Sequence, residues 1–335
     1  MGSGRGSGLL LGVDAGNTKT IALVARHDGT VAGLGTAGCG DIHNAPTPDV
    51  GLDEIVRACL AALAAAGVSG RELAASAFSL AGADWPEDFE LLREELAARL
   101  GLVTPPQVVN DAIGAIRCGT TDGVGVAAVC GTHGTAGARN AAGAVYHFGF
   151  WPDGTGAWAL GSEALEAVMR ADLGIGEATS LTGRALAWWN ADSPVELLHA
   201  FTRLGEPRIP VSDRALFAAA VLDEADAGDP VASDIVGFAG RRLGDYARVC
   251  AERTEQTGSE FPLVLCGGVL RHPSALLRAS IVGSVPGAVP VYPSVEPVVG
   301  AILLAADGIG VQPSLDALAE AVLSLPPLDD GSKGR

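Results

Sequence analysis

The feature that most constrains the fold is an order of secondary structure elements that occurs twice. In roughly the first 110 residues, apolar and β-branched runs alternate with turn residues and with two stretches of helical spacing, which predicts the order βββαβαβ. A second round of strands begins near Val124. One order that occurs twice indicates an internal duplication. The elements of the first round are expected at Leu9–Val13, Thr18–Ala25, Val31–Gly35, Leu52–Ala66, Leu73–Leu80, Glu87–Leu100 and Gln107–Val109.

The second round is interrupted by a long helical insertion. Amphipathic segments follow one another from Trp158 to about Arg253, before a strand at Leu263–Leu265. Because 335 residues exceed the size at which single cores usually stop growing, we expect two domains with a cleft between them. We place the N-terminal domain at 9–112 and the larger C-terminal domain at 113–325. The other expected elements are strands at Val124–Val129, Thr135–Arg139, Ala144–Phe148 and Val289–Tyr292, a helix after Pro273 and a helix at Pro297–Ala306.

Composition excludes two classes of partner. The formal net charge of −17 repels nucleic acid phosphates, and no basic stripe interleaved with aromatic residues offsets it. Hydrophobic residues make up 48% of the chain, yet no apolar run approaches the roughly 20 residues that span a bilayer. The Gly/Ser stretch Met1–Gly8 and the short apolar run after it do not have the form of a signal peptide. We therefore expect a cytoplasmic protein that binds neither nucleic acid nor membrane.

A hairpin near the N-terminus suits a ligand that carries phosphates. The first strand ends in the turn Asp14-Ala15-Gly16-Asn17, and Thr18, Lys19 and Thr20 lead into the second. Backbone N–H groups, hydroxyls and an ammonium can then meet one anion, and Asp14 can hold hydrated Mg²⁺ beside it. An ordinary hairpin turn, which also favours Asp, Gly and Asn, is the alternative. The residues expected to bind ATP here are Gly16, Asn17, Thr18, Lys19 and Thr20.

A second glycine turn follows the first strand of the second round. Its sequence is Cys130-Gly131-Thr132-His133-Gly134-Thr135, and its main-chain donors could reach the other side of the same phosphates. The residues expected to bind ATP in this turn are Gly131, Thr132 and Gly134.

These motifs resemble those of a known superfamily. The stretch from Gly12 to Thr20 and the second glycine turn are similar to the two phosphate motifs of sugar kinases, Hsp70 and actin. Three further stretches, Ser79–Asp84, Asn110–Ala112 and Gly154–Trp158, resemble segments of the BadF/BadG/BcrA/BcrD ATPase family, which contains N-acetylglucosamine kinase. The resemblance spans roughly residues 9 to 306. It implies an α/β fold of two actin-like ATPase domains, which is a duplicated ribonuclease H-like fold with a cleft between its domains.

The resemblance also implies roles for single residues. Asp111 would be the general base that accepts the proton of the attacking sugar hydroxyl, with an N-cap of the following helix as its alternative role. Gly267 and Gly268, in Cys266-Gly267-Gly268-Val269, would form the adenosine motif, or else an ordinary strand-to-helix turn. Asn44 would bind a sugar hydroxyl. The full set of residues expected to bind substrate is His43, Asn44, Gly82, Asp84, Asn110 and Asp153; a loop imidazole is the alternative for His43, and a helix N-cap for Asp84.

The chain departs from the family pattern in two places. The second phosphate turn has His133 and Gly134 where the family usually has Gly and Ser. The family segment Gly-Asp-Glu-Gly-Ser-Gly becomes Trp151-Pro152-Asp153-Gly154-Thr155-Gly156, so Pro152 takes the place of a substrate-binding aspartate. These departures point to a different sugar, a shifted role for Asp153, or an acceptor that is not a sugar.

The resulting expectation is an ATP-dependent, Mg²⁺-dependent kinase of a small sugar, most simply an amino sugar such as N-acetylglucosamine or glucosamine, acting as a homodimer. One alternative is the ATP-driven activator of an electron-transfer dehydratase, which would clamp an iron–sulfur cluster between exposed cysteines. The chain has six cysteines but no CxxC motif, and no pair of them stands out as the ligands of such a cluster. A second alternative is a nucleotide sensor without turnover.

Overall fold

The computed structural model describes residues 8–148, 154–205 and 208–323. These residues form two compact units. The first unit contains the described residues of 1–127, 137–147 and 291–335, and the second contains those of 128–136 and 148–290. Residues 113–127 and those from 291 onward thus group with the N-terminal part, whereas the sequence prediction divides the chain at residue 112. The predicted domain boundary at residue 112 stays a prediction.

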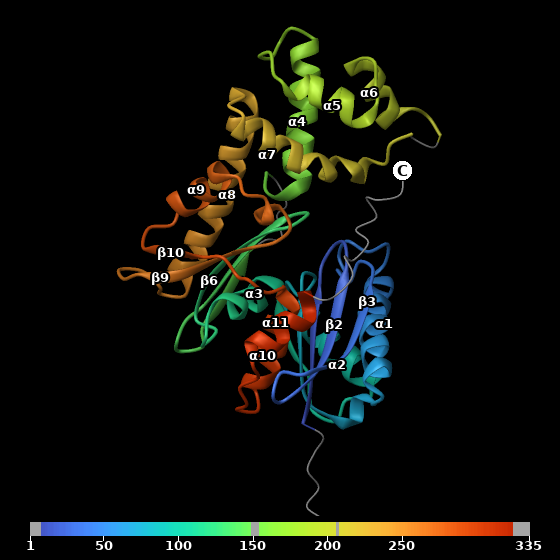
Figure 1. Ribbon diagram of the computed structural model, residues 1–335, viewed down its shortest axis with the longest axis vertical. Helices are drawn as coiled ribbons and strands as arrows, with labels where there is room; N and C mark the ends of the chain where they lie inside the picture. Colours follow the sequence, from blue (N-terminus) through green and yellow to red (C-terminus); the bar gives the residue numbers. More distant parts are fainter. Residues whose placement is uncertain (1–7, 149–153, 206–207, 324–335) are drawn as a thin grey trace, which may run out of the picture. The chain divides into compact units, whose positions relative to one another are not determined.

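The first unit contains a five-stranded sheet in the order β3-β2-β1-β4-β5 (Figure 1). β1 pairs antiparallel with β2 and parallel with β4, and β4 pairs parallel with β5. All five strands were predicted, with ends that differ by a few residues at most. Their bounds are β1 Leu9–Ala15, β2 Thr20–Arg26, β3 Val31–Ala37, β4 Leu73–Leu80 and β5 Gln107–Asn110.

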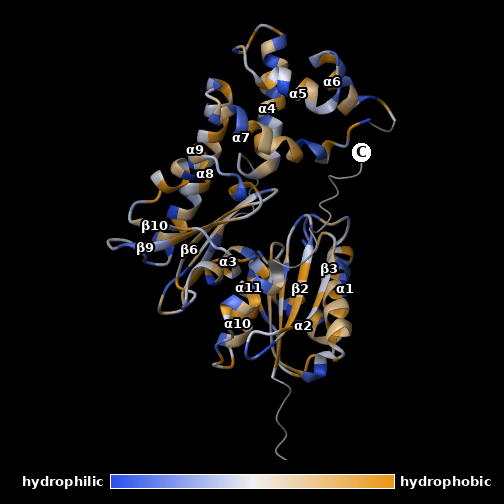
Figure 2. Ribbon diagram, viewed as in Figure 1, coloured by the Kyte–Doolittle hydropathy of each residue, from blue (hydrophilic) through white to orange (hydrophobic). Residues whose placement is uncertain are grey.

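Helices cover both faces of this sheet. α1 (Pro48–Ala66) and α2 (Pro86–Leu100) bury the side chains on one face, and α10 (Pro297–Asp307) packs on the other. Leu9, Leu11 and Val13 of β1 point into the first core, and Leu10 points into the second. Figure 2 shows β2 as a mostly apolar strand, as expected for a strand buried on both faces.

Gly12 lets α10 approach the middle of β1. A Cβ atom at Gly12 would lie 2.4 Å from the backbone nitrogen of Ile302, closer than real Cβ atoms come to their neighbours. The absence of a side chain at this position therefore sets the distance between the sheet and the helix that covers it.

A second five-stranded sheet has the order β10-β9-β6-β7-β8. Read from its other end, β8-β7-β6-β9-β10, it repeats the first sheet strand for strand, because β6 to β10 take the places of β1 to β5. The predicted duplication is therefore confirmed. The bounds are β6 Gly125–Cys130, β7 Gly134–Arg139, β8 Val145–Phe148, β9 Phe261–Cys266 and β10 Ala288–Val291.

The helical insertion lies between β8 and β9, as predicted. Within it, residues 211–226 form a 3-10 helix followed by an α-helix, a change that periodicity alone does not reveal because no breaking residue separates them. The predicted elements omit a C-terminal helix, α11 (Leu315–Leu323). The remaining helices are α3 Asp111–Gly119, α4 Gly156–Asp172, α5 Leu181–Trp189, α6 Pro194–Thr202, α7 Ala218–Asp226, α8 Pro230–Arg253 and α9 Ala275–Gly283, with 3-10 helices at Gly70–Glu72, Val211–Phe217 and Val269–Arg271. Among the described residues, no helix is both long enough and apolar enough to cross a membrane.

We expect Gly12→Ala to lower the free energy of unfolding by about 1–3 kcal/mol, because the new methyl group meets backbone atoms of α10 that cannot move separately. The measurement is urea denaturation followed by circular dichroism. Gly183→Ala in α5 is the control, because a Cβ there has no neighbour within 4 Å and alanine favours the helix by about 1 kcal/mol. Equal stability of the two variants would contradict the close approach.

Candidate active site

Most of the predicted site residues follow the ends of three neighbouring strands in the first unit. β1, β4 and β5 are parallel, and Ala15, Leu80 and Asn110 are in register across them. The residues after these positions therefore emerge at one edge of the sheet. They include the β1–β2 turn, the segment Ala81–Asp84 and Asp111, and Asp14 lies one residue before the end of β1.

The β1–β2 turn has an exposed tip and a fixed base. The Gly16 N–H donates to the Lys19 carbonyl over 3.0 Å, and the buried Thr20 hydroxyl donates to the Gly38 carbonyl over 2.9 Å. Thr20 is thus used to hold the turn against the segment after β3. Thr18 is exposed, and Asn17 and Lys19 are half-buried, so these three side chains can meet a ligand.

Asp111 is the first residue of α3, and its neighbour Asn110 caps that helix. The Asn110 side chain is 2% exposed and accepts from the Ala112 N–H over 3.1 Å. The capping role considered for Asp111 therefore falls to Asn110. Asp111 Oδ1 is buried and has no hydrogen bond partner among the described residues. Burial, followed by the carboxylates of Asp14 and Asp84, raises the pKa of Asp111 to about 7.

Asp84 and Asn110, both expected to bind substrate, bind each other. Asn110 Nδ2 donates to Asp84 Oδ1 over 3.2 Å and to the Ala83 carbonyl over 3.3 Å. Burial raises the pKa of Asp84 to about 6, and the nearby Asp41 carboxylate acts in the same direction. Asp84 does not cap α2, since the N-cap position is Trp85.

Asp41 orders the loop that carries His43 and Asn44. Its buried carboxylate accepts from the His43 N–H over 2.9 Å and from Asn44 Nδ2 over 2.8 Å. Gly82 lies against this loop, because a Cβ there would come within 2.9 Å of Asp41 Oδ1. The loop and the segment after β4 are therefore in contact.

Sequence reasoning missed two residues of this network. Asp88 Oδ2 bonds to His43 Nε2 over 2.9 Å, and the position of Asp88 three residues after the N-cap of α2 is the signal of a capping box. His147 Nε2 lies 3.2 Å from the Asp84 carbonyl, and burial lowers the pKa of His147. No local pattern in the sequence indicates this second contact.

In the second unit, the turn after β6 is fixed to the start of α4. The carbonyls of Gly131 and Thr132 accept from the N–H groups of Ala157 and Trp158 over 2.9 and 3.0 Å. Gly134 lies against Thr155, whose buried hydroxyl has no partner among the described residues. The segment Gly154–Trp158, which the family resemblance singled out, thus supports the predicted phosphate turn.

The predicted adenosine motif follows β9. Gly267 has a φ of 104°, and a Cβ there would lie 2.5 Å from the Cys130 carbonyl oxygen, so only glycine fits between the two strand ends. Gly268 has no neighbour within 4 Å of its Cβ position. Asp153, with Trp151 and Pro152, lies outside the described residues, and its predicted role stays a prediction.

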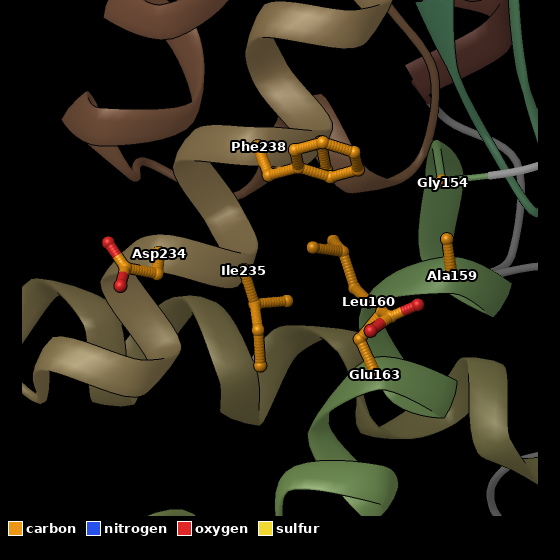
Figure 3. A pocket seen from close by; sticks show the side chains of 8 residues that line it. Gly154, Ala159, Leu160, Glu163, Asp234, Ile235 and Phe238 are labelled. Atoms are coloured by element: carbon orange, nitrogen blue, oxygen red, sulfur yellow. The ribbon is translucent and has the colours of Figure 1, made fainter. Parts of the chain in front are cut away.

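A pocket of about 190 Å³ in the second unit contains none of the predicted site residues. Figure 3 shows it between α4, with Leu160 and Glu163, and α8, with Ile235 and Phe238. Its lining is mostly apolar, unlike the carboxylate-rich edge of the first sheet.

Comparison with known proteins decides the family. A model of the BadF/BadG/BcrA/BcrD ATPase family matches residues 11–305. The chain belongs to this family. The family match covers both sheets, both glycine turns and the helical insertion of the chain.

Similar proteins extend over the whole length of the family match. An N-acetyl-D-glucosamine kinase of Dictyostelium discoideum is 24% identical over 313 residues, which cover 89% of this chain and 97% of the relative. A crystal structure from Chromobacterium violaceum, assigned as an N-acetylglucosamine kinase, has a TM-score of 0.67 at 22% identity and covers 88% of this chain and 98% of its own. A ROK family glucokinase from Streptomyces griseus has a TM-score of 0.57 at 20% identity and covers 90% of this chain and 100% of its own. These structures confirm the predicted actin-like fold for this member of the family.

We expect Asp111→Asn to raise the melting temperature by a few degrees at pH 8 and by less at pH 5. The folded pKa of Asp111 lies above the ordinary aspartate value of 3.8, so the folded state binds this proton more tightly than the unfolded state does. Stability is therefore lost as the pH rises toward and through about 7. Asparagine cannot ionise, and it removes that loss.

Differential scanning fluorimetry across this pH range measures the effect. Asp316→Asn, at an exposed carboxylate of α11, is the control and should melt like the wild type at each pH. A lower melting temperature of Asp111→Asn at pH 8 would show that the ionised carboxylate stabilises the fold.

Proposed function

We propose that this chain is an ATP-dependent sugar kinase, which transfers the γ-phosphoryl group of ATP to a hydroxyl of an amino sugar such as N-acetylglucosamine or glucosamine. The observation that carries the proposal is the Asp111 carboxylate, whose Oδ1 is buried without a partner among the described residues and whose pKa is raised to about 7. Membership of an ATPase family and the N-acetyl-D-glucosamine kinase relative support it.

Asp111 is suited to the role of general base. A base works best when its pKa lies near the operating pH, because it is then ionised and still able to accept a proton. In the proposed reaction the sugar hydroxyl oxygen forms a bond to the γ-phosphorus as the bond to the ADP oxygen breaks, and Asp111 takes the hydroxyl proton. Transfer of this kind depends mostly on positioning and on charge stabilisation.

The phosphates of ATP are assigned to the two glycine turns. Asn17, Thr18 and Lys19 line the exposed tip of the first turn, and Lys19 supplies its positive charge. In the second, fixed turn, the Gly131 N–H donates to the His133 carbonyl over 3.0 Å and closes the turn, and Gly131, Thr132 and Gly134 are assigned to the phosphates. Gly267 and Gly268 are assigned to the adenosine, where the bare backbone at Gly268 leaves room for a base or a ribose.

A magnesium ion fits this site through one carboxylate. No group of three or more acidic, His or Cys side chains among the described residues could hold a metal by itself. Mg²⁺ commonly takes one or two carboxylates and completes its shell with phosphate oxygens and water, and Asp14, partly exposed at the end of β1, supplies one. When bound, the ion would neutralise charge on the phosphates.

The sugar is assigned to the network around Asp41. Asn44 Nδ2 already donates to Asp41, so the Asn44 amide oxygen is oriented as an acceptor for a sugar hydroxyl. Asp84, with Asn110 as its donor, offers a second acceptor, and His43 and Gly82 border the same loop. A homodimer in the cytoplasm completes the proposal.

We expect Asp111→Asn to lower kcat by about 10²-fold or more while leaving the affinity for ATP unchanged, because asparagine cannot accept the proton. Lys19→Ala should weaken ATP binding and turnover together, because it removes a charge from the phosphates. A coupled ADP-release assay with glucosamine, N-acetylglucosamine, N-acetylmannosamine, glucose and N-acetylmuramic acid measures turnover, and calorimetry measures ATP binding.

Three results would each contradict a part of this proposal. Full activity of Asp111→Asn would remove the general base assignment. ATP binding without turnover on any sugar would favour the nucleotide sensor, and visible absorbance of anaerobically purified protein would favour the dehydratase activator. Of the six cysteines, Cys59, Cys118, Cys130 and Cys250 are buried, which disfavours a cluster held by these thiols.

We expect kcat/KM for the sugar to fall roughly tenfold for each pH unit below the pKa of Asp111, because only ionised Asp111 accepts a proton. The midpoint should lie at or below about pH 7, since the Asp111 pKa is raised to about 7 and a bound cation would lower it again. A pH–rate profile at saturating ATP and Mg²⁺ gives the midpoint. A profile that is flat from pH 5 to 8 would exclude Asp111 as the titrating base.

A further inference from the structure

One carboxylate oxygen joins two segments of the proposed sugar site. Asp88 Oδ2 bonds to His43 Nε2 over 2.9 Å, and it accepts from the backbone N–H groups of Trp85 over 2.9 Å and of Asp84 over 3.2 Å. Asp88 is 6% exposed, whereas the His43 side chain is 36% exposed, so a buried carboxylate holds an imidazole that reaches solvent. The loop after β3 and the turn after β4 are therefore held at a fixed separation.

Helix capping alone does not account for this arrangement. In a capping box the N-cap N–H donates to the side chain three residues later, as the Ser69 N–H donates to Glu72 over 2.8 Å at the 3-10 helix Gly70–Glu72, and no residue from another segment is needed. Asp88 makes that bond to Trp85 and adds an imidazole from a loop 45 residues away in sequence. The additional partner, His43, is one of the residues assigned to the substrate.

The charges around His43 favour its protonated form. Burial lowers the pKa of His43, but the hydrogen bond and charge of Asp88 and the charges of Asp84 and Asp41 outweigh burial, and the pKa is raised. These acids lie on α2, on the turn after β4 and on the loop of His43 itself. His43 in turn lowers the pKa of Asp84, so the ring and Asp84 favour each other's charged form.

We propose that Asp88 is a positioning residue for sugar binding, which fixes the His43 ring beside Asp84 and holds the two segments together. The inference rests on the proposed kinase function for its effect on the sugar, but its structural part does not. Asp88 would act through His43 and Asp84, and it would not touch the reacting atoms. Its loss should therefore affect the binding of the sugar more than the chemical step.

We expect Asp88→Asn to raise the KM for the sugar about tenfold, with a smaller change in kcat and no change in ATP affinity, because a bond to a charged group is lost. Asparagine retains a carbonyl oxygen for the helix cap, but it removes the negative charge. Asp88→Asn should also shift the His43 titration, followed by NMR of the ¹³C-labelled imidazole, to lower pH.

The matched control is Glu72→Gln, which alters the equivalent acid of the other capping box, outside the sugar network. It should leave the sugar KM and the His43 titration unchanged. Combining Asp88→Asn with His43→Gln should raise KM no further than either single change, because the two residues act as one unit.

The outcomes separate the two proposals. A wild type that phosphorylates no sugar would overturn the kinase function. An unmoved His43 titration in Asp88→Asn would overturn the positioning role whatever the activity, and so would an equal rise of KM in Glu72→Gln.

Discussion

The candidate site depends on the parallel pairing of β1, β4 and β5. In parallel strands the carboxyl ends meet at one edge, and the register places Ala15, Leu80 and Asn110 in one row. Asp14 and Asp111 lie beside this row, Asp84 follows it in the segment after β4, and Asp41 lies in a loop that packs on that segment. A shift of this register by one residue would turn each of these side chains to the opposite face of the sheet. The buried apolar residues on both faces prevent such a shift.

The same edge gathers negative charges that the fold does not neutralise. The pKa values of Asp111 and Asp84 are raised to about 7 and about 6, so ionising them costs the folded state stability. Hydrogen bonds satisfy Asp84 and Asp41, but Asp111 Oδ1 has none among the described residues. A buried carboxylate with a raised pKa is more typical of a functional site than of a residue that serves only to stabilise the fold.

The fold was predictable from the sequence to a large extent, because apolar periodicity and turn residues report on local structure. β4 was predicted residue for residue, and the duplication followed from the order of the strands. The parallel register brings Asp14, Asp84 and Asp111 to one edge of the sheet, a proximity that was not part of the sequence prediction. The partners of these residues were not predictable, because the bonds of Asp88 to His43 and of His147 to the Asp84 carbonyl join segments far apart in sequence. The helix cap belongs to Asn110 instead of Asp111 because the helical backbone already begins at Asp111, and sequence patterns do not fix helix ends to a single residue.

The duplication also explains how one ancestral arrangement can supply two kinds of binding surface. β6 and β9 take the places of β1 and β4, and the residues after their ends are Gly131 and Gly267. The first copy has Asp111 directly after β5, whereas the second copy has Tyr292 directly after β10. At these equivalent strand ends, acids that can move a proton or hold a cation are found in the first copy, and glycine turns that expose backbone donors dominate the second. Because backbone donors favour anions and carboxylates favour cations and acidic protons, the difference at Asp111 and Tyr292 gives the two copies different binding properties at the same position of the fold.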